Sequence, residues 1–243
     1  MAVTETPLRP FVEDQVWAKR IRLKFPSKWF GAQMGSRMTV MRLSDGGLFV
    51  HSPVGLDPVL KAAVDALGPV RYVIAPNRLH HLFVSDWVAA YPDADFWCAP
   101  ELAKKRADVP WTGVLGDGPE PGWATDIDQA ALRGNRFMTE ILFHHRASRT
   151  LVVTDALESF HRTDHGPLAC ALARLGGVWE RAGYTRDQRL MVKDRAAFRR
   201  SVERVLVWDF DRIVLAHGHL VERDGKRVFR EAFGWLGFKH SRL

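Results

Sequence analysis

Two adjacent histidines, His80 and His81, stand just past the carboxyl end of an apolar run at residues 70–75. Other apolar, β-branched runs end in a similar way, at His144 and His145, at Asp155, and at His217 and His219. Strand ends can converge in space, and imidazole together with carboxylate is a donor set that suits zinc, iron or manganese. The spacing of these residues therefore indicates a candidate metal site.

The paired histidines are the stronger candidates for this site. Burying two neutral imidazoles side by side requires several hydrogen-bond partners, so packing alone explains His80 and His81 poorly. Asp155 has a second interpretation as a helix N-cap, because Ala156-Leu-Glu-Ser follows it. The remaining histidines are weaker candidates: His51 is a supporting or surface residue by its position, and three others lie outside strand ends, namely His161, His165 and His240.

Composition favours one soluble domain. The chain has 243 residues, 47% of them hydrophobic, which predicts a single domain over residues 1–243 with residues 1–34 as an amino-terminal extension packed on it. Its two cysteines do not form a disulfide framework, so a reducing compartment is expected. The first residues lack the pattern of a signal peptide, and no stretch reaches the roughly 18 apolar residues of a membrane span. We therefore expect a cytoplasmic protein with no membrane partner.

The net charge of +7 at pH 7 is compatible with an anionic partner. A basic run could meet a phosphate backbone; it comprises Arg20, Arg22, Lys24 and Lys28, interleaved with Trp17, Phe25 and Trp29. An amphipathic strand with a solvated basic face explains the same run, and we favour that interpretation. The expected partner is a small molecule, with an anionic substrate compatible with the charge, rather than nucleic acid.

The elements that must position the candidate residues alternate between strands and helices. Apolar patterning and turn residues predict hairpins at 38–43/47–51 and 139–143/150–154, further strands at 70–75, 95–98 and 211–216, and helices at 57–67, 82–91, 100–106, 168–181 and 194–207. The segment 109–131, rich in Gly, Pro and Asp, is predicted to be a long loop. This order indicates an α/β protein with two sheets covered by helices.

The residues around the first histidine pair resemble a known signature. The stretch at residues 73–81 is similar to the strand-Thr-His-x-His-x-Asp-His motif of the metallo-β-lactamase superfamily, and the chain resembles its DUF4336 branch most closely. By register, Pro76 and Arg78 take the places of the first two histidines, His80 takes the place of the aspartate, and His81 matches the final histidine. The signature is therefore degenerate in its first half.

Three later positions continue the resemblance, which spans residues 35–220. His145, or its neighbour His144, stands where the superfamily has its next histidine. Asp155 matches the carboxylate of the superfamily's Gly-Asp pair, and His217 matches the histidine of the closing motif. The resemblance implies a four-layer αββα sandwich with the site along one edge, between the two sheets.

The departures from the signature imply one metal ion rather than two. The implied ligands are His80, His81, Asp155 and His217, with His145 as a fifth; zinc is expected first, with iron or manganese as alternatives. Arg78 would place a positive charge where the first metal of the superfamily sits, and there it could bind a substrate carboxylate or phosphate.

The resemblance implies a metal-dependent hydrolase. A mononuclear metal-bound water would attack a small ester, lactone, amide or phosphoester, with Asp155, His219 or a histidine that is not a ligand as general base. Two alternatives stay open. One is an iron-dependent oxidoreductase on the same fold, and the other is a non-catalytic domain that binds a metal or a ligand.

Overall fold

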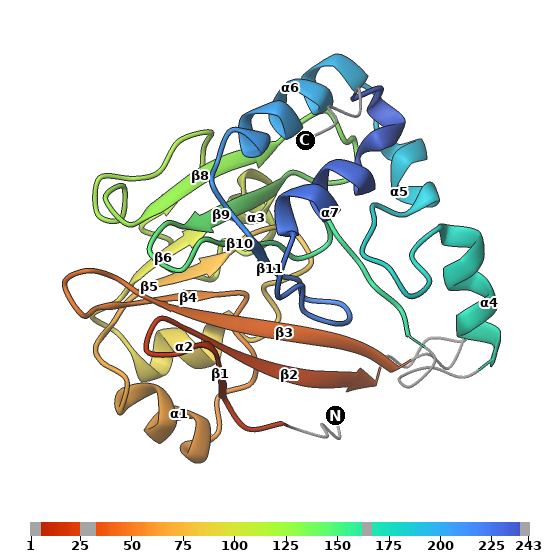
Figure 1. The fold of residues 1–243 in the computed structure, drawn as a ribbon. Helices are drawn as coiled ribbons and strands as arrows, with labels where there is room; N and C mark the ends of the chain where they lie inside the picture. Colours follow the sequence, from red (N-terminus) through yellow and green to blue (C-terminus); the bar gives the residue numbers. More distant parts are fainter. Residues whose placement is uncertain (1–5, 25–32, 162–166, 239–243) are drawn as a thin grey trace.

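The computed structural model describes residues 6–24, 33–161 and 167–238 (Figure 1). Part of the basic run, namely Phe25, Lys28 and Trp29, lies outside the described residues, as do His165 and His240. No helix in the described part of the chain is long and apolar enough to cross a membrane.

The first sheet has its strands in sequence order from β1 to β7. They are β1 (Arg9–Val12), β2 (Val16–Lys24), β3 (Gln33–Arg42), β4 (Leu48–His51), β5 (Val70–Ala75), β6 (Asp95–Cys98) and β7 (Gly113–Val114). Neighbours are antiparallel from β1 to β4 and parallel from β4 to β7. The predicted hairpin of β3 and β4 is confirmed, and β1 and β2 come from the segment expected as an extension.

The second sheet has the order β11-β10-β9-β8. Its strands are β8 (Ile127–Leu132), β9 (Glu140–His145), β10 (Thr150–Val152) and β11 (Arg212–Val214). β10 is parallel to β11 and antiparallel to β9, which is antiparallel to β8. As a result, the amino end of β9 lies beside the carboxyl ends of β10 and β11.

Helices cover the outer face of each sheet. The helices of the described residues are α1 (Pro58–Asp65), α2 (Val84–Ala90), α3 (Pro100–Lys105), α4 (Pro167–Gly176), α5 (Arg186–Met191), α6 (Arg195–Leu206) and α7 (Gly225–Ala232), followed by the short 3₁₀ helix η1 (Gly234–Leu236). Side chains of α1 and α2 share a core with the first sheet, and those of α6 and α7 share one with the second. The predicted αββα arrangement is confirmed (Figure 1).

The core between the two sheets is rich in aromatic rings. Phe49 of β4 is fully buried there. Its ring centroid lies 5.2 Å from that of Phe143 on β9 and 5.3 Å from that of Trp123. Rings at these separations and tilts interact favourably beyond the burial of their area. These ring contacts hold the two sheets together in the interior of the protein, next to the edge at which the candidate residues lie.

Local sequence signals explain the helix that follows β4. Asp57 is the N-cap of α1, where its side chain accepts a hydrogen bond of 2.7 Å from the backbone N–H of Leu60, and Pro58 occupies the first turn. The pattern missed several elements, namely β1, β7, β8, α5, α7 and η1. Residues 127–132 form β8 inside the predicted loop, because Asp128, Gln129 and two alanines give a weak strand pattern that pairing with β9 overrides.

We expect Phe49→Ala to lower the free energy of unfolding by about 3–5 kcal/mol, because it leaves a cavity between the sheets. Val59→Ala, at a side chain that is 80% exposed, should change it by less than about 0.5 kcal/mol. Urea unfolding followed by tryptophan fluorescence measures both. Equal stabilities for the two variants would contradict this account of the core.

Candidate metal centre

His80 lies in the turn that joins β5 to α2. Asn77 holds this turn, since its side-chain Oδ1 accepts hydrogen bonds from the backbone N–H groups of Leu79 (2.8 Å) and His80 (3.0 Å). Asparagine favours such turns because its short amide bonds to backbone groups two or three residues on. The turn fixes the direction in which the His80 side chain leaves the backbone.

Asp155 follows β10 on the second sheet. The buried carboxylate of Glu140, at the start of β9, accepts hydrogen bonds from the backbone N–H groups of Thr154 (2.6 Å) and Asp155 (2.9 Å). Asn77 reaches across from the first sheet, and its Nδ2 donates to Thr154 Oγ1 (2.9 Å) and Asp155 Oδ2 (2.6 Å). Residues of both sheets therefore hold the Asp155 carboxylate in place.

His217 follows β11 and precedes Gly218, whose φ of +115° lies in the region that favours glycine. A Cβ at position 218 would collide with the backbone of Ser159. Arg37 of β3 donates hydrogen bonds to the carbonyl groups of Leu215 and Gly218, the latter at 2.8 Å. This close packing and the two hydrogen bonds fix the loop that carries His217.

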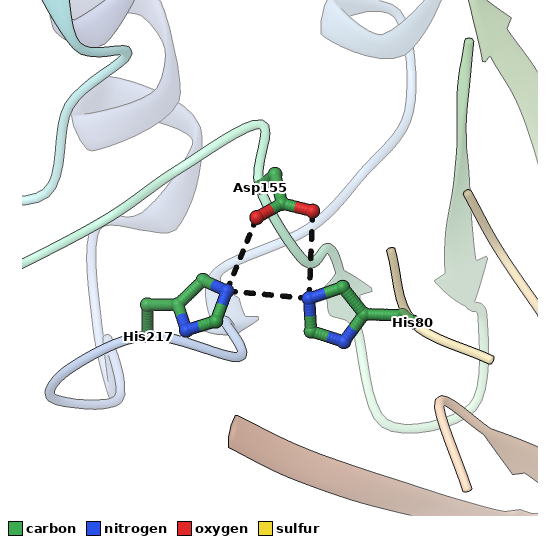
Figure 2. Close-up of side chains that lie close together, drawn as sticks. All are labelled: His80, Asp155 and His217. Carbon is green, nitrogen blue, oxygen red and sulfur yellow. Dashed lines mark hydrogen bonds and ion pairs between the residues drawn. The ribbon is translucent and has the colours of Figure 1, made fainter. Parts of the chain in front are cut away.

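The three side chains point toward one another (Figure 2). The Nε2 atoms of His80 and His217 are 3.2 Å apart. Asp155 places Oδ2 3.4 Å from the first of these atoms and Oδ1 3.1 Å from the second. The ligand atoms lie within 4.8 Å of one another, and each residue is at most 8% exposed. Three potential metal ligands therefore converge at one buried point.

The other ring nitrogens of both histidines have partners. Nδ1 of His80 lies 2.8 Å from Ser52 Oγ, and Nδ1 of His217 donates to the carbonyl oxygen of Gly35 at 2.5 Å. A metal-binding histidine commonly uses its second nitrogen in this way, which fixes the ring and its tautomer. In both rings, Nε2 is therefore the nitrogen that faces the centre of the cluster.

Burial and mutual contacts set the charges of the cluster. Burial alone would raise the pKa of Asp155, but the charge of His80 and the hydrogen bond with His217 lower it well below its usual range. Burial would lower the pKa of His217, but the hydrogen bond and charge of Asp155 raise it to about 9. Burial and the charge of Asp155 raise the pKa of Glu140, and the backbone hydrogen bonds that its carboxylate accepts oppose this shift. Without a metal ion, Asp155 thus faces an imidazolium at His217.

The cluster fits a divalent transition metal. Two imidazole nitrogens and one carboxylate are ligands that zinc and iron(II) accept. Such an ion would replace the proton on His217 Nε2 and would meet the lone pairs of all three side chains. The residues brought together, His80, Asp155 and His217, are three of the five predicted ligands.

The cluster forms part of the wall of a pocket of about 180 Å³. Polar groups of Ser52, His81 and Lys105 line it, together with the apolar side chains of Leu79, Leu82 and Phe83. Pockets for drug-sized ligands have volumes of about 300–1,000 Å³. This pocket therefore suits a small molecule with an apolar part.

His81, the second member of the predicted pair, lines the pocket but lies outside the three-residue cluster. Its Nε2 is 2.9 Å from Lys105 Nζ, and its Nδ1 is 3.1 Å from Arg106 Nη1. Burial, with the charges of Lys105 and Arg106, lowers the pKa of His81 to about 4, so the ring is neutral at pH 7. Basic side chains thus occupy both nitrogens that could bind a metal.

The structure does not bring His145 or His144 to the cluster. β9 runs antiparallel to β10, so the carboxyl end of β9 lies at the opposite end of the sheet from Asp155. There His145 contacts Ser148 Oγ (2.8 Å) and donates to the Arg42 carbonyl (2.9 Å), while His144 pairs with Asp128 (2.9 Å). The interpretation of His145 as a fifth ligand does not fit this placement.

Arg78 and His219 are not among the residues that line this pocket. The Arg78 guanidinium donates to the carbonyl oxygen of Phe137 (2.8 Å) and lies 4.7 Å over its ring. His219 lines a second cavity with His161, the two ring centroids being 3.9 Å apart. The two predicted catalytic residues Arg78 and His219 are therefore not in the lining of the pocket that contains the cluster.

Sequence reasoning missed several residues that support the cluster. Asn77 carries a signal, since an asparagine directly after a strand is typical of a turn that bonds to its own backbone. Glu140 is a carboxylate at the start of a predicted strand, and only the strand direction shows that it meets Asp155. Ser52 and Gly35 have no signal in the sequence.

Comparisons with known proteins agree with this geometry. Residues 14–171 match the sequence profile of a family described as "Domain of unknown function (DUF4336)". The chain belongs to the DUF4336 family. A search of curated proteins finds no match to this DUF4336 chain.

Solved structures show which fold this DUF4336 chain has. The DIM-1 metallo-β-lactamase exposed to ceftazidime superimposes with a TM-score of 0.64 at 12% identity, over 96% of this chain and 98% of that one. FIM-1 from Pseudomonas aeruginosa, in a mono-zinc form, gives 0.61 at 9% identity over 98% of both chains. The Flv1 flavodiiron core from Synechocystis gives 0.64 at 12%, over 98% of this chain and 62% of that one. The resemblance to DUF4336 is confirmed, and the chain has the fold of these metallo-β-lactamase structures.

Glu140→Gln should weaken divalent metal binding by about 10- to 100-fold, because an amide nitrogen cannot accept the hydrogen bond that a carboxylate oxygen accepts, so Asp155 shifts. Glu101→Gln is a matched control, since Glu101 accepts a bond from the Thr139 N–H (2.8 Å) and does not touch the cluster. Calorimetric titration with Zn²⁺ compares them. A Glu140 variant that binds like the control would show that this carboxylate does not position Asp155.

The pH dependence of stability tests the electrostatics beside the pocket. Burial, together with the charge of His80, lowers the pKa of His51 from 6.5 to about 3. The unfolded chain therefore takes up this proton first, and stability falls as the pH drops from about 6.5 toward 3, by at most about 1.4 kcal/mol per unit from this group.

In His51→Leu this contribution is absent. The variant should lose stability less steeply than the parent between pH 6.5 and 4.5, and the two should run in parallel above pH 7.5. Urea unfolding in the presence of a chelator measures both slopes. Parallel curves over the whole range would contradict the lowered pKa.

Proposed function

We propose that this DUF4336 protein is a metal-dependent hydrolase of a small ester, lactone, amide or phosphoester, and that it uses a single metal ion. The convergence of His80, Asp155 and His217 in the wall of a small pocket carries the proposal. Catalytic zinc sites typically have three protein ligands and keep one position for water or substrate. The mono-zinc form of FIM-1 supports a single ion on this fold.

One divalent ion at this cluster would supply a Lewis acid and would lower the pKa of a bound water to about 7. The residues around the cluster hold its ligands in the orientation that metal binding requires. Ser52 and Gly35 orient the rings of His80 and His217 so that both Nε2 atoms face the centre.

The surroundings of the cluster favour reaction over simple storage of a metal. Asn77 and Glu140 hold the Asp155 segment in place. The Asp155 carboxylate could therefore bind a metal ion without moving. Leu82 and Phe83 give one side of the pocket an apolar wall, beside which electrostatic interactions are stronger than in bulk water.

The donor set favours a second candidate, an iron-dependent oxidoreductase. Two histidines and one carboxylate with open positions form the ligand set of non-haem iron(II) oxygenases. The similarity to the core of a protein named as flavodiiron supports iron on this fold. The identity of the bound metal separates the two candidates.

Metal content and hydrolysis together test the proposal. The purified parent should hold about one zinc ion per chain, and His217→Ala should hold less than about a tenth of that amount. His219→Ala, two residues along in an exposed position, is the matched control and should keep its metal. Elemental analysis gives the occupancy.

The loaded parent and the His219 variant should hydrolyse at least one of 4-nitrophenyl acetate, a γ-lactone and 4-nitrophenyl phosphate. Activity should disappear with a chelator and return with the metal. A zinc-loaded protein that hydrolyses none of the three would support a non-catalytic binding domain. Bound iron with visible absorbance changes on adding dioxygen would support the oxidoreductase.

A further inference from the structure

Lys105 ends α3 and is an exposed residue in the lining of the pocket that contains the metal cluster. Its Nζ donates to the carbonyl oxygen of Arg78 (2.8 Å) and lies 2.9 Å from His81 Nε2. Both partners are uncharged groups, and the third N–H of the ammonium has no hydrogen-bond acceptor among the residues that the structure describes. Among the residues that the structure describes, no carboxylate forms an ion pair with Lys105.

Two further basic side chains stand beside Lys105. Arg106 forms an ion pair with Asp108, with Nη2 and Oδ2 2.7 Å apart. Arg78 uses its guanidinium on the Phe137 carbonyl. Burial and the charges of Arg78 and Arg106 lower the pKa of Lys105, which shows that positive charge is crowded here. Of these three neighbouring cations, Arg106 is the one that forms an ion pair with a carboxylate of the described residues.

His81 adds to this excess of donors. A neutral imidazole has one nitrogen that accepts and one that donates. Since Lys105 and Arg106 both present N–H groups to this ring, one of the two contacts sets a donor against a donor. An anion beside Lys105 would supply the acceptor atoms that this part of the pocket lacks.

The neighbouring wall of the pocket has the opposite character. Leu79 is 42% exposed and Leu82 is 49% exposed, and both line the pocket together with Phe83. Large apolar side chains that stay exposed around a pocket are typical of a ligand-binding surface. A ligand in this pocket can therefore contact a cation, an apolar wall and the metal cluster at once.

We propose that Lys105 binds the oxyanion, a carboxylate or a phosphate, of a small amphiphilic ligand whose apolar part lies against Leu79, Leu82 and Phe83. This subsite uses none of the three residues of the metal cluster. The role of the ligand as a substrate rests on the proposed function, whereas its binding does not.

Calorimetric titration of the metal-free protein tests this subsite. The full chain is treated with a chelator and dialysed, so that an anion cannot bind to a metal ion instead. The probes are hexanoate, hexyl phosphate and, as an uncharged reference, hexanol. Lys105→Met removes the charge and keeps the length of the side chain. Lys104→Met, at the preceding residue of the same helix, is the matched control because Lys104 does not line the pocket.

The parent and Lys104→Met should bind at least one of the two anions about tenfold more tightly than Lys105→Met does, the loss expected for one charge-assisted hydrogen bond. The affinity for hexanol should be the same in all three proteins. A preference for hexyl phosphate assigns a phosphate, and a preference for hexanoate assigns a carboxylate.

Equal binding of both anions by the two variants, or no binding by the parent, would overturn the subsite. Acetate or inorganic phosphate that binds as tightly as its hexyl counterpart would overturn the apolar part of the proposal. Because these titrations use no metal and no turnover, they can succeed when the hydrolase proposal fails, and they can fail when it succeeds. Circular dichroism checks that both variants fold like the parent.

Discussion

The side chain of Asn77 connects the two sheets at the candidate site, and the geometry of the site depends on it. Its Oδ1 holds the turn that carries His80, while its Nδ2 donates to Thr154 and Asp155 on the second sheet. Next to it, the carbonyl of Pro76 accepts a backbone hydrogen bond of 2.9 Å from Ile141 at the start of β9. These bonds bring ligands from separate sheets within reach of one another, which neither sheet could do alone.

Looking for histidine and aspartate after the carboxyl ends of strands predicted the site correctly for those strands whose carboxyl ends meet at the same edge. His80, Asp155 and His217 each follow the carboxyl end of a strand, and the fold brings these ends to one edge between the sheets. The same reasoning failed for His145, because β9 runs the other way and presents Glu140 at this edge. A single sequence shows that a strand exists, but its direction in the sheet is set by pairing with distant residues.

The sequence alone could not show which of two adjacent histidines belongs to the cluster. His80 and His81 have equal claims in the sequence, since a turn allows either side chain to point inward. The structure separates them through their partners, which are Asn77 and Ser52 for His80 and two basic side chains for His81. Those basic side chains come from the end of α3, about 25 residues away in sequence, so no local pattern could reveal them.

The degenerate signature gains a physical meaning from this arrangement. In register with the superfamily motif, Pro76 and Arg78 replace two metal-binding histidines, and we inferred that a positive charge at Arg78 takes over part of their role. The structure directs Arg78 toward Phe137 and instead lines the pocket with Lys105, whose ammonium is held by the Arg78 carbonyl. A fixed cation beside a single metal site can orient an anionic group by charge, but it cannot acidify a water as a second metal would. On the proposed function, the metal cluster therefore carries the chemistry, and the Lys105 side of the pocket selects the ligand.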